Sequence, residues 1–203
     1  MKRKRLTHEQ RRHQTRERLL RAARKMFIKK GFDRTSVEDI VDAAGYTRGA
    51  FYSNFGGKSE LLLEVLRWDH DSARAGLQAV IEKVGSREEM TASAIAFYNG
   101  YLRDNECFLL WVEARLLARN DATVRQCITD FHREKLSHIG AHILAVFERV
   151  GMMPPLQAEV LALGVLSLCD GMLSLRVCDP RIADNEVIDR WLALLFLGKA
   201  HGY

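Results

Sequence analysis

The sequence predicts an all-α protein, with an N-terminal three-helix helix-turn-helix domain followed by a larger helical domain. Apolar residues recur at helical spacing along most of the 203 residues, and no segment shows the sustained period-two alternation of a half-buried strand. The three prolines, Pro154, Pro155 and Pro180, all lie in the last quarter of the chain, at expected helix boundaries. A composition with 47% hydrophobic residues suits a helical core that needs no disulfides.

The order of the helices follows from this periodicity and from the residues that begin and end each pattern. Thr35 begins the second helix, and Glu38, three residues later, completes an expected capping box. Gly45 ends that helix, because a left-handed backbone there causes no Cβ clash. Thr47 can cap the short third helix. The predicted helices cover residues 14–30, 35–44, 48–54, 59–84, 87–105, 106–119, 122–150, 156–177 and 185–200.

The charge of the chain is unevenly distributed. Residues 1–60 hold 16 Lys and Arg against 7 Asp and Glu, whereas residues 61–203 hold 15 against 19. A basic first third suggests a polyanionic partner for the N-terminal part. We therefore distinguish a basic arm at residues 1–11 and a basic N-terminal part from the acidic remainder of the chain. The arm either contacts DNA or is a solvated tail.

The helices on either side of Gly45 form a helix-turn-helix pattern, whose second helix enters the major groove of DNA. Arg48 can reach a base edge, since bidentate Arg–guanine pairing is the commonest specific contact. Gly49 has no side chain to hold the backbone away from DNA. Tyr52 is one helical turn beyond Arg48 and shares its face, so its hydroxyl can donate to a phosphate. The pattern predicts a DNA-reading helix too short to persist alone.

The stretch "GFDRTSVEDIVDAAGYTRGAFYSNFGGKSELL" resembles the TetR-type DNA-binding signature over about residues 12–72. Its landmarks are the T-[ST]-V start of the second helix, the small residues before Gly45, the G-x-[FLI]-Y-x-x-F recognition helix and the K-x-x-L that opens the next helix. Asn54, where the family often carries His, and the Gly56-Gly57 pair depart from the pattern. The resemblance implies phosphate contacts from Thr35, Ser36, Tyr52 and Lys58, base-edge contacts from Thr47, Arg48 and Gly49, and a phosphate-facing edge at Asn54.

The resemblance also implies the domain organisation: a DNA-binding domain at residues 12–72 after the basic arm, and a helical regulatory and dimerisation domain at residues 73–203. It further implies a homodimer that binds a palindromic operator, with the last two helices pairing across the two-fold axis. The helix over 156–177 is apolar almost all round and must be covered on most sides. A stripe of small residues, including Gly164 and Gly171, would let a partner helix approach closely. The predicted interface comprises Gly164, Leu168, Gly171, Met172, Leu175, Trp191, Leu194 and Leu195. A monomeric core is the alternative for the same residues.

Family members usually bind a small molecule in the body, and large aromatic residues on the central helices suit such a pocket. Ordinary core packing is the competing interpretation for each of them. The predicted pocket comprises Trp68, Phe97, Tyr101, Phe108, Trp111, Arg115, Phe131 and His138. The expected ligand is a small hydrophobic or aromatic molecule.

No catalytic constellation, nucleotide-binding loop or metal motif is visible, so the chain is not expected to be an enzyme or to hold a cofactor. His138 and His142 have helical ligand spacing, but no third ligand accompanies them. The four cysteines are expected to be buried and reduced. Neither a signal peptide nor about 18 uninterrupted apolar residues occurs, which predicts a protein of the bacterial cytoplasm with no membrane partner.

The leading hypothesis is a homodimeric repressor that binds a palindromic operator and is released by a small ligand. An alternative is an architectural DNA-binding protein of the same fold, with the body as a protein-interaction surface. A third class, an α-helical enzyme or membrane-surface protein with a basic N-terminus, is disfavoured because the arm is charged on all sides.

Overall fold

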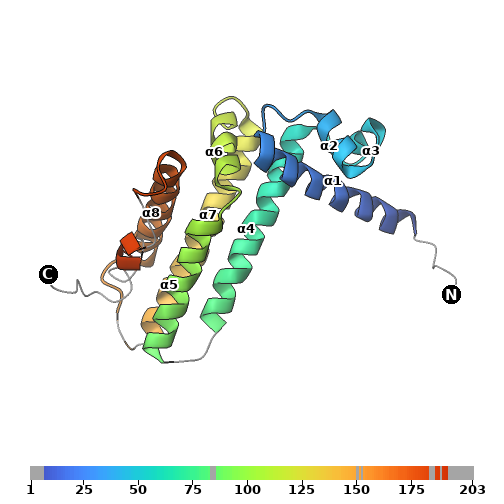
Figure 1. Cartoon of the computed structure of the whole chain (residues 1–203). Coiled ribbons are helices and arrows are strands. Elements are labelled where there is room, and N and C mark those ends of the chain that lie inside the picture. Colours follow the sequence, from blue (N-terminus) through green and yellow to red (C-terminus); the bar gives the residue numbers. More distant parts are fainter. Residues whose placement is uncertain are drawn as a thin grey trace. The chain divides into compact units, whose positions relative to one another are not determined.

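The structure is a computed structural model that describes residues 7–82, 86–149, 151, 153–182, 186–187 and 189–191. These residues form helices and connecting turns, with no strand among them, which confirms the predicted all-α class. The helices are α1 (His8–Lys30), α2 (Val37–Ala44), α3 (Arg48–Tyr52), α4 (Lys58–Glu82), α5 (Arg87–Asp104), α6 (Phe108–Leu117), α7 (Ala122–Arg149) and α8 (Ala158–Cys178), as Figure 1 shows.

The predicted boundaries of the second to eighth helices agree with the structure to within two residues, whereas the first helix begins earlier than predicted. Helix α1 begins at His8 rather than at residue 14, because Thr7 and Gln10 form a reciprocal capping box. The Thr7 hydroxyl accepts a hydrogen bond from the Gln10 amide at 3.2 Å. The predicted helix over 185–200 falls mostly on residues outside the described ranges, as do residues 1–6 of the basic arm.

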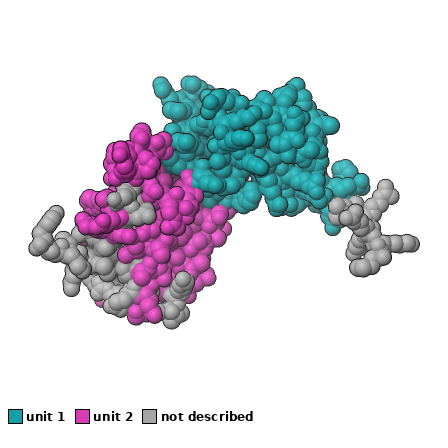
Figure 2. All heavy atoms as spheres, viewed as in Figure 1, with its two compact units in different colours: residues 1–69, 106–129 teal, residues 70–105, 130–203 magenta. Residues whose placement is uncertain are grey.

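The chain divides into two compact units that differ from the predicted domains. Unit 1 comprises residues 1–69 and 106–129, and unit 2 comprises residues 70–105 and 130–203 (Figure 2). Residues 106–129 were assigned to the body from the sequence, but they belong with the helix-turn-helix. The Trp111 indole donates to Asp69 at 2.7 Å, and the Glu113 carboxylate accepts from the Phe32 amide at 2.9 Å. The local hydrophobic periodicity of the sequence does not signal these contacts between distant segments.

Unit 1 has a core drawn from every helix that contributes to it. Arg16 ties three of these elements together: it donates to the Asn54 carbonyl at 2.6 Å, pairs with Glu64 at 2.9 Å and lies over the Phe55 ring. The largest fully buried side chains of the unit are Phe27, Phe51, Phe55, Leu19, Ile40, Leu61, Leu62, Leu66 and Leu110. Burial of these aromatic and branched side chains stabilises the short helices α2 and α3, which are too short to persist alone.

Unit 2 packs one face of α8 against its core, through Ala158, Ala162, Val165, Cys169, Met172 and Leu173. The opposite face is apolar yet exposed, with Val160, Leu163 and Leu175 about half accessible. Cover for this face by the helices of a second chain therefore stays a prediction. The mean hydropathy of α8 reaches 1.7, so length and composition alone would allow it to cross a membrane. One such helix is weak evidence, because core helices pass the same test.

Candidate nucleic-acid interface and cavity

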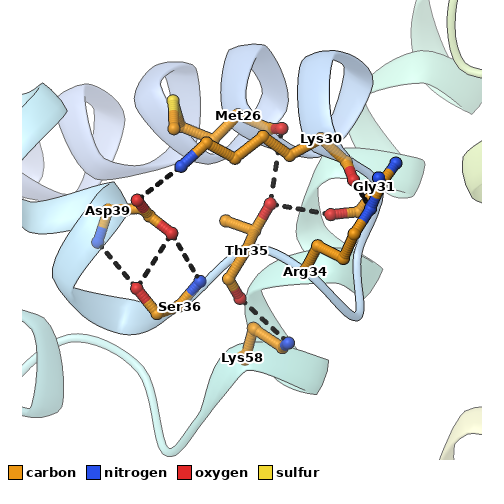
Figure 3. Close-up of polar contacts among 8 residues, drawn as sticks. All are labelled: Met26, Lys30, Gly31, Arg34, Thr35, Ser36, Asp39 and Lys58. Atoms are coloured by element: carbon orange, nitrogen blue, oxygen red, sulfur yellow. Dashed lines mark hydrogen bonds and ion pairs between the residues drawn. The ribbon is translucent and has the colours of Figure 1, made fainter.

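Ser36, not Thr35, caps the second helix, which corrects the predicted capping box (Figure 3). The Ser36 hydroxyl accepts from the Asp39 amide at 3.0 Å, and the Asp39 carboxylate accepts from the Ser36 amide at 2.9 Å. Asp39 also pairs with Lys30 at 2.6 Å. The Lys30 ammonium first, and the Ser36 donors next, lower the pKa of Asp39 to about 2. The start of α2 is therefore held by a charged network, and Glu38 has no part in the cap.

Thr35, the residue before this cap, is buried. Only 1% of the residue is exposed, and its hydroxyl donates to the Gly31 carbonyl at 2.7 Å (Figure 3). Its amide donates to the Phe32 carbonyl at 3.2 Å. Both donors of Thr35 serve the turn between α1 and α2, so the predicted phosphate contact from its side chain is not supported. Ser36, the next residue, remains exposed.

Lys58 was also predicted to contact phosphate, yet its ammonium binds the backbone of the same turn. It donates to the carbonyl oxygens of Phe32 at 2.7 Å and Thr35 at 2.9 Å, with Asp33 more distant at 3.4 Å. It also lies 4.2 Å from the centroid of the Phe32 ring. An ammonium has three N–H donors, and here all three have a carbonyl within reach. Lys58 therefore links the start of α4 to the turn that precedes α2.

The third helix presents a polar face outward and an aromatic face inward. Phe51 and Phe55 are buried, whereas Thr47, Arg48, Gly49 and Tyr52 are exposed. The Thr47 hydroxyl caps α3 by accepting from the Ala50 amide at 3.3 Å. These four exposed residues, together with Ser36, form what we call the reading face.

Gly49 lies on the reading face at a position where a side chain would fit without a close contact. A Cβ added at this position would meet only the Thr47 hydroxyl, at 3.8 Å, which is ordinary contact. The fold therefore does not require glycine here. Close approach of the backbone to another molecule would.

Asn54 lies two residues after the end of α3 and contacts the backbone of that helix. Its amide nitrogen donates to the Ala50 carbonyl at 2.8 Å, and its backbone carbonyl accepts from Arg16. The side chain is half-buried, so the predicted phosphate-facing role for Asn54 competes with this structural one.

Two residues at this surface were missed by sequence reasoning. Arg16 supports the end of α3, as described above. Glu38 forms an ion pair with Arg48, with 2.7 Å between the carboxylate and guanidinium. The two residues belong to different helices on either side of the turn, so neither helical spacing nor a local motif signals the pair.

Unit 2 contains a cavity of about 60 Å³ with an almost entirely apolar wall. It is lined by His70, Ala73, Arg74, Leu77, Phe97, Tyr98, Tyr101, Lys135, His138, Ile139, Val165, Leu166 and Cys169. The predicted pocket residues Phe97, Tyr101 and His138 are among them.

Five other predicted pocket residues do not line this cavity. Trp68, Phe108, Trp111 and Arg115 belong to unit 1, where Phe108 and Trp111 are buried and Trp68 is exposed. Phe131 is buried in unit 2, with its ring 5.5 Å from that of His70. Aromatic side chains on apolar helices are equally suited to cores and to pockets, which is why residue type alone did not separate them.

Three residues that line the cavity, His70, Tyr98 and Cys169, favour their neutral forms, whereas Arg74 and Lys135 also lie at its wall. Burial lowers the pKa of His70, helped by Lys135 and opposed by Glu134, whose carboxylate lies 3.0 Å from the ring. Burial also raises the pKa of the Cys169 thiol to about 12 and raises that of Tyr98. The largely apolar wall suits binding of a molecule with apolar groups. No cluster of three metal-binding side chains occurs within the described ranges.

The predicted interface residues divide between the two faces of α8. Gly164, Gly171 and Leu175 lie on the exposed face, and Leu168 is half-buried. Met172 is wrongly placed by the prediction, because it faces the core of unit 2 with 6% exposure. Trp191 is exposed, whereas Leu194 and Leu195 lie outside the described residues.

The residues of the reading face lie in a segment that matches a known protein family. Residues 19–65 match the family described as bacterial regulatory proteins, tetR family. The transcriptional activator FasR of Mycolicibacterium smegmatis is 30% identical over 111 residues, which cover 54% of this chain and 48% of FasR. The transcriptional regulator TtgR of Pseudomonas putida is 44% identical over 61 residues, 29% of each chain. The matched region thus spans about half of FasR and less than a third of TtgR.

Solved structures share the fold over nearly the whole chain. The transcriptional regulator FadR of Bacillus subtilis, in complex with stearoyl-CoA, has a TM-score of 0.72 at 16% identity, covering 91% of this chain and 99% of that one. FasR, TtgR and FadR are all named as transcriptional regulators rather than enzymes.

Proposed function

Because the chain belongs to the tetR family of bacterial regulatory proteins, we propose that it is a DNA-binding transcriptional regulator. The observation that carries this proposal is the reading face. Thr47, Arg48, Gly49 and Tyr52 are exposed together on a five-residue helix that buried Phe51 and Phe55 hold in place. This arrangement suits a recognition helix in the major groove, with Arg48 available for guanine.

We propose that the chain acts as a homodimer on a palindromic operator. The exposed face of α8 supports this, since Leu163 and Leu175 flank a stripe of small residues that includes Gly164 and Gly171. An exposed apolar helix face of this kind is typical of an interaction site. A two-fold dimer would present two reading faces to two half-sites one or more helical turns apart.

We propose further that a small apolar or aromatic molecule binds the cavity of unit 2 and releases the protein from DNA. Most of the residues that line the cavity are apolar or aromatic, which supports this ligand class. FadR, solved with stearoyl-CoA, shows that a protein of this fold holds a ligand with a long apolar chain. At about 60 Å³ the cavity is smaller than the roughly 150 Å³ that holds benzene. A ligand would therefore extend out of the cavity or displace the side chains that border it.

Helix α4 offers a route for the release. Its residues His70, Ala73 and Leu77 line the cavity, and its first residue, Lys58, binds the turn that precedes α2. A ligand that favours a shifted α4 would change the position of that turn, as a population shift between two states.

The experiment that tests the function is selection of genomic fragments by the purified chain at physiological salt, followed by sequencing. One palindromic motif near a few promoters is the expected result. Broad enrichment without a palindrome would instead indicate an architectural role. An absence of enrichment would contradict DNA binding if the same protein, after unfolding and refolding to remove bound ligand, also failed to select DNA.

The proposed direction of regulation is repression, because a dimer that occupies an operator within a promoter blocks access to it. FasR, by contrast, is named an activator. A reporter that carries the selected operator decides between them: deletion of the regulator raises transcription if it represses and lowers it if it activates.

A further inference from the structure

The guanidinium of Arg48 is held from two sides on the reading face. Glu38, on α2, approaches to 2.7 Å, and the ring centroid of Tyr52, one turn further along α3, lies 5.9 Å away. Together the Tyr52 hydroxyl and the Glu38 carboxylate raise the pKa of Arg48. All three side chains are exposed, with 62% of the Arg48 side chain and 53% of the Glu38 side chain accessible.

The stability of the fold explains Glu38 only in part, because a negative charge in the exposed first turn of α2 adds a small stabilisation. Exposed ion pairs contribute little to folding, because water screens them and two long side chains lose freedom. The cap of α2 uses Ser36 and Asp39, so Glu38 is not needed there either. A carboxylate beside the reading face also repels phosphates and weakens sequence-independent binding. Glu38 therefore has a cost for DNA binding that some gain must offset.

The gain follows from the geometry of a guanidinium, which has five N–H donors in a rigid fork. One edge can bind the Glu38 carboxylate while another binds O6 and N7 of a guanine. A long arginine without this restraint would also reach phosphate oxygens at any sequence. The Glu38 carboxylate neutralises the charge of Arg48, so Arg48 gains less from an anionic phosphate, whereas the neutral O6 and N7 acceptors of guanine can still bind the free edge of the fork.

We propose that Glu38 is a specificity-determining residue: it positions Arg48 for guanine and disfavours the use of Arg48 on phosphate. This inference rests on the proposed function, because it assumes that the reading face binds DNA. It adds that the acidic residue, which lowers overall affinity, is the source of discrimination between operator and other sequences.

The test compares Glu38→Gln with the wild type on the operator selected from genomic fragments and on a non-specific duplex of equal length. Glutamine keeps the size of the side chain and removes the charge. We expect affinity for the non-specific duplex to rise severalfold and the ratio of operator to non-specific affinity to fall about tenfold. The lost preference should be confined to guanine positions when single base pairs of the operator are replaced.

The matched control is Asp42→Asn, which removes an equal charge from an exposed position of the same helix. It should alter affinity on both duplexes to a similar extent and leave their ratio unchanged. In an Arg48→Ala background, Glu38→Gln should no longer change the ratio. A change there would show that Glu38 acts on a base by itself, which overturns the positioning role.

A ratio that Glu38→Gln leaves intact in the wild-type background would also overturn the proposal. Failure of the proposed function is separate: it would appear as a wild-type protein with no preference for any operator. Thermal unfolding of both variants without DNA should stay close to that of the wild type, since neither residue caps α2 and a charge in an exposed first turn contributes little.

Discussion

At the scale of single residues, Lys58 illustrates how a position with an expected DNA role can serve the fold. Its ammonium binds carbonyl oxygens of Phe32 and Thr35 in the turn before α2. Charge-assisted hydrogen bonds of this kind contribute more than neutral ones. A lysine that only contacted phosphate would leave the free energy of unfolding unchanged in the absence of DNA.

We therefore predict that Lys58→Met lowers the free energy of unfolding by about 2 kcal/mol without DNA, because the turn carbonyls lose their donor. Urea denaturation at one fixed protein concentration measures this, since dimerisation would otherwise shift the midpoint. Lys25→Met, at an exposed position of α1, is the control and should change stability little. Equal stability of both variants would return Lys58 to a purely DNA-contacting role.

His142 should make stability depend on pH. The residue is 1% exposed on α7, and burial, with a smaller contribution from Arg149, lowers its pKa to about 4. In the unfolded chain the histidine has its ordinary pKa of about 6.5. At a pH between the folded and the unfolded pKa, the unfolded chain therefore binds a proton at His142 that the folded chain does not bind. Stability is therefore complete above the unfolded pKa and is lost as the pH falls, by about 2 kcal/mol between pH 7.5 and 5.

His142→Leu should remove this part of the pH dependence, whereas His13→Leu, at an exposed position of α1, should retain it. Denaturation of each variant at the two pH values gives the comparison. The idea fails if His142→Leu loses as much stability on acidification as the wild type does.

At the scale of helices, the sequence patterns predicted which helices exist and in what order better than they predicted the cap of α2 and the grouping of α6. The apolar periodicity and the turn residues identified α1 to α8, because both signals are local. The capping box was assigned one residue too early, since Thr35 and Ser36 can each cap a helix and only burial of Thr35 against Gly31 distinguishes them. The grouping of α6 with the helix-turn-helix depends on contacts of Asp69 and Glu113 that join distant segments.

The reading face and the cavity also show that sequence patterns group residues correctly within a local motif but not across distant segments. Residues within one motif, such as Arg48 and Tyr52, were predicted together and lie together on α3. Phe97, Tyr101 and His138 were predicted with Phe108 and Trp111, yet the first three line the cavity and the other two fill the core of unit 1. Aromatic character is common to both environments, so only tertiary packing separates them.

The exposed face of α8 leads to a prediction about the oligomeric state of the chain. Leu163 lies on this exposed apolar face, and a charge there would have to be buried in a dimer. We expect the wild type to sediment as a dimer at micromolar concentration and Leu163→Glu to sediment as a monomer. Leu116→Glu, an equally exposed position on α6, is the control and should stay dimeric. A dimeric Leu163→Glu variant would place the interface elsewhere.

At the scale of the whole molecule, dimerisation and DNA affinity should be linked. A dimer that engages both halves of a palindrome binds the second half-site intramolecularly, at a high effective concentration. The wild type should therefore bind the full operator about 100-fold more tightly than a duplex with one half-site intact. Fluorescence anisotropy with labelled duplexes of equal length measures this ratio without a change in total charge.

The monomeric Leu163→Glu variant separates recognition of a single half-site from the gain in affinity that dimerisation provides. It keeps the reading face on α3, so its affinity for the single half-site should match that of the wild type at protein concentrations below the dimerisation range. It lacks the second reading face, so its preference for the full operator should shrink to about twofold, because two equivalent half-sites double the chance of binding. A wild-type protein that bound both duplexes equally would contradict the two-fold arrangement, even if the reading face recognised its half-site. A variant that lost affinity for the half-site as well would show that α8 supports the fold of the chain and not only its pairing.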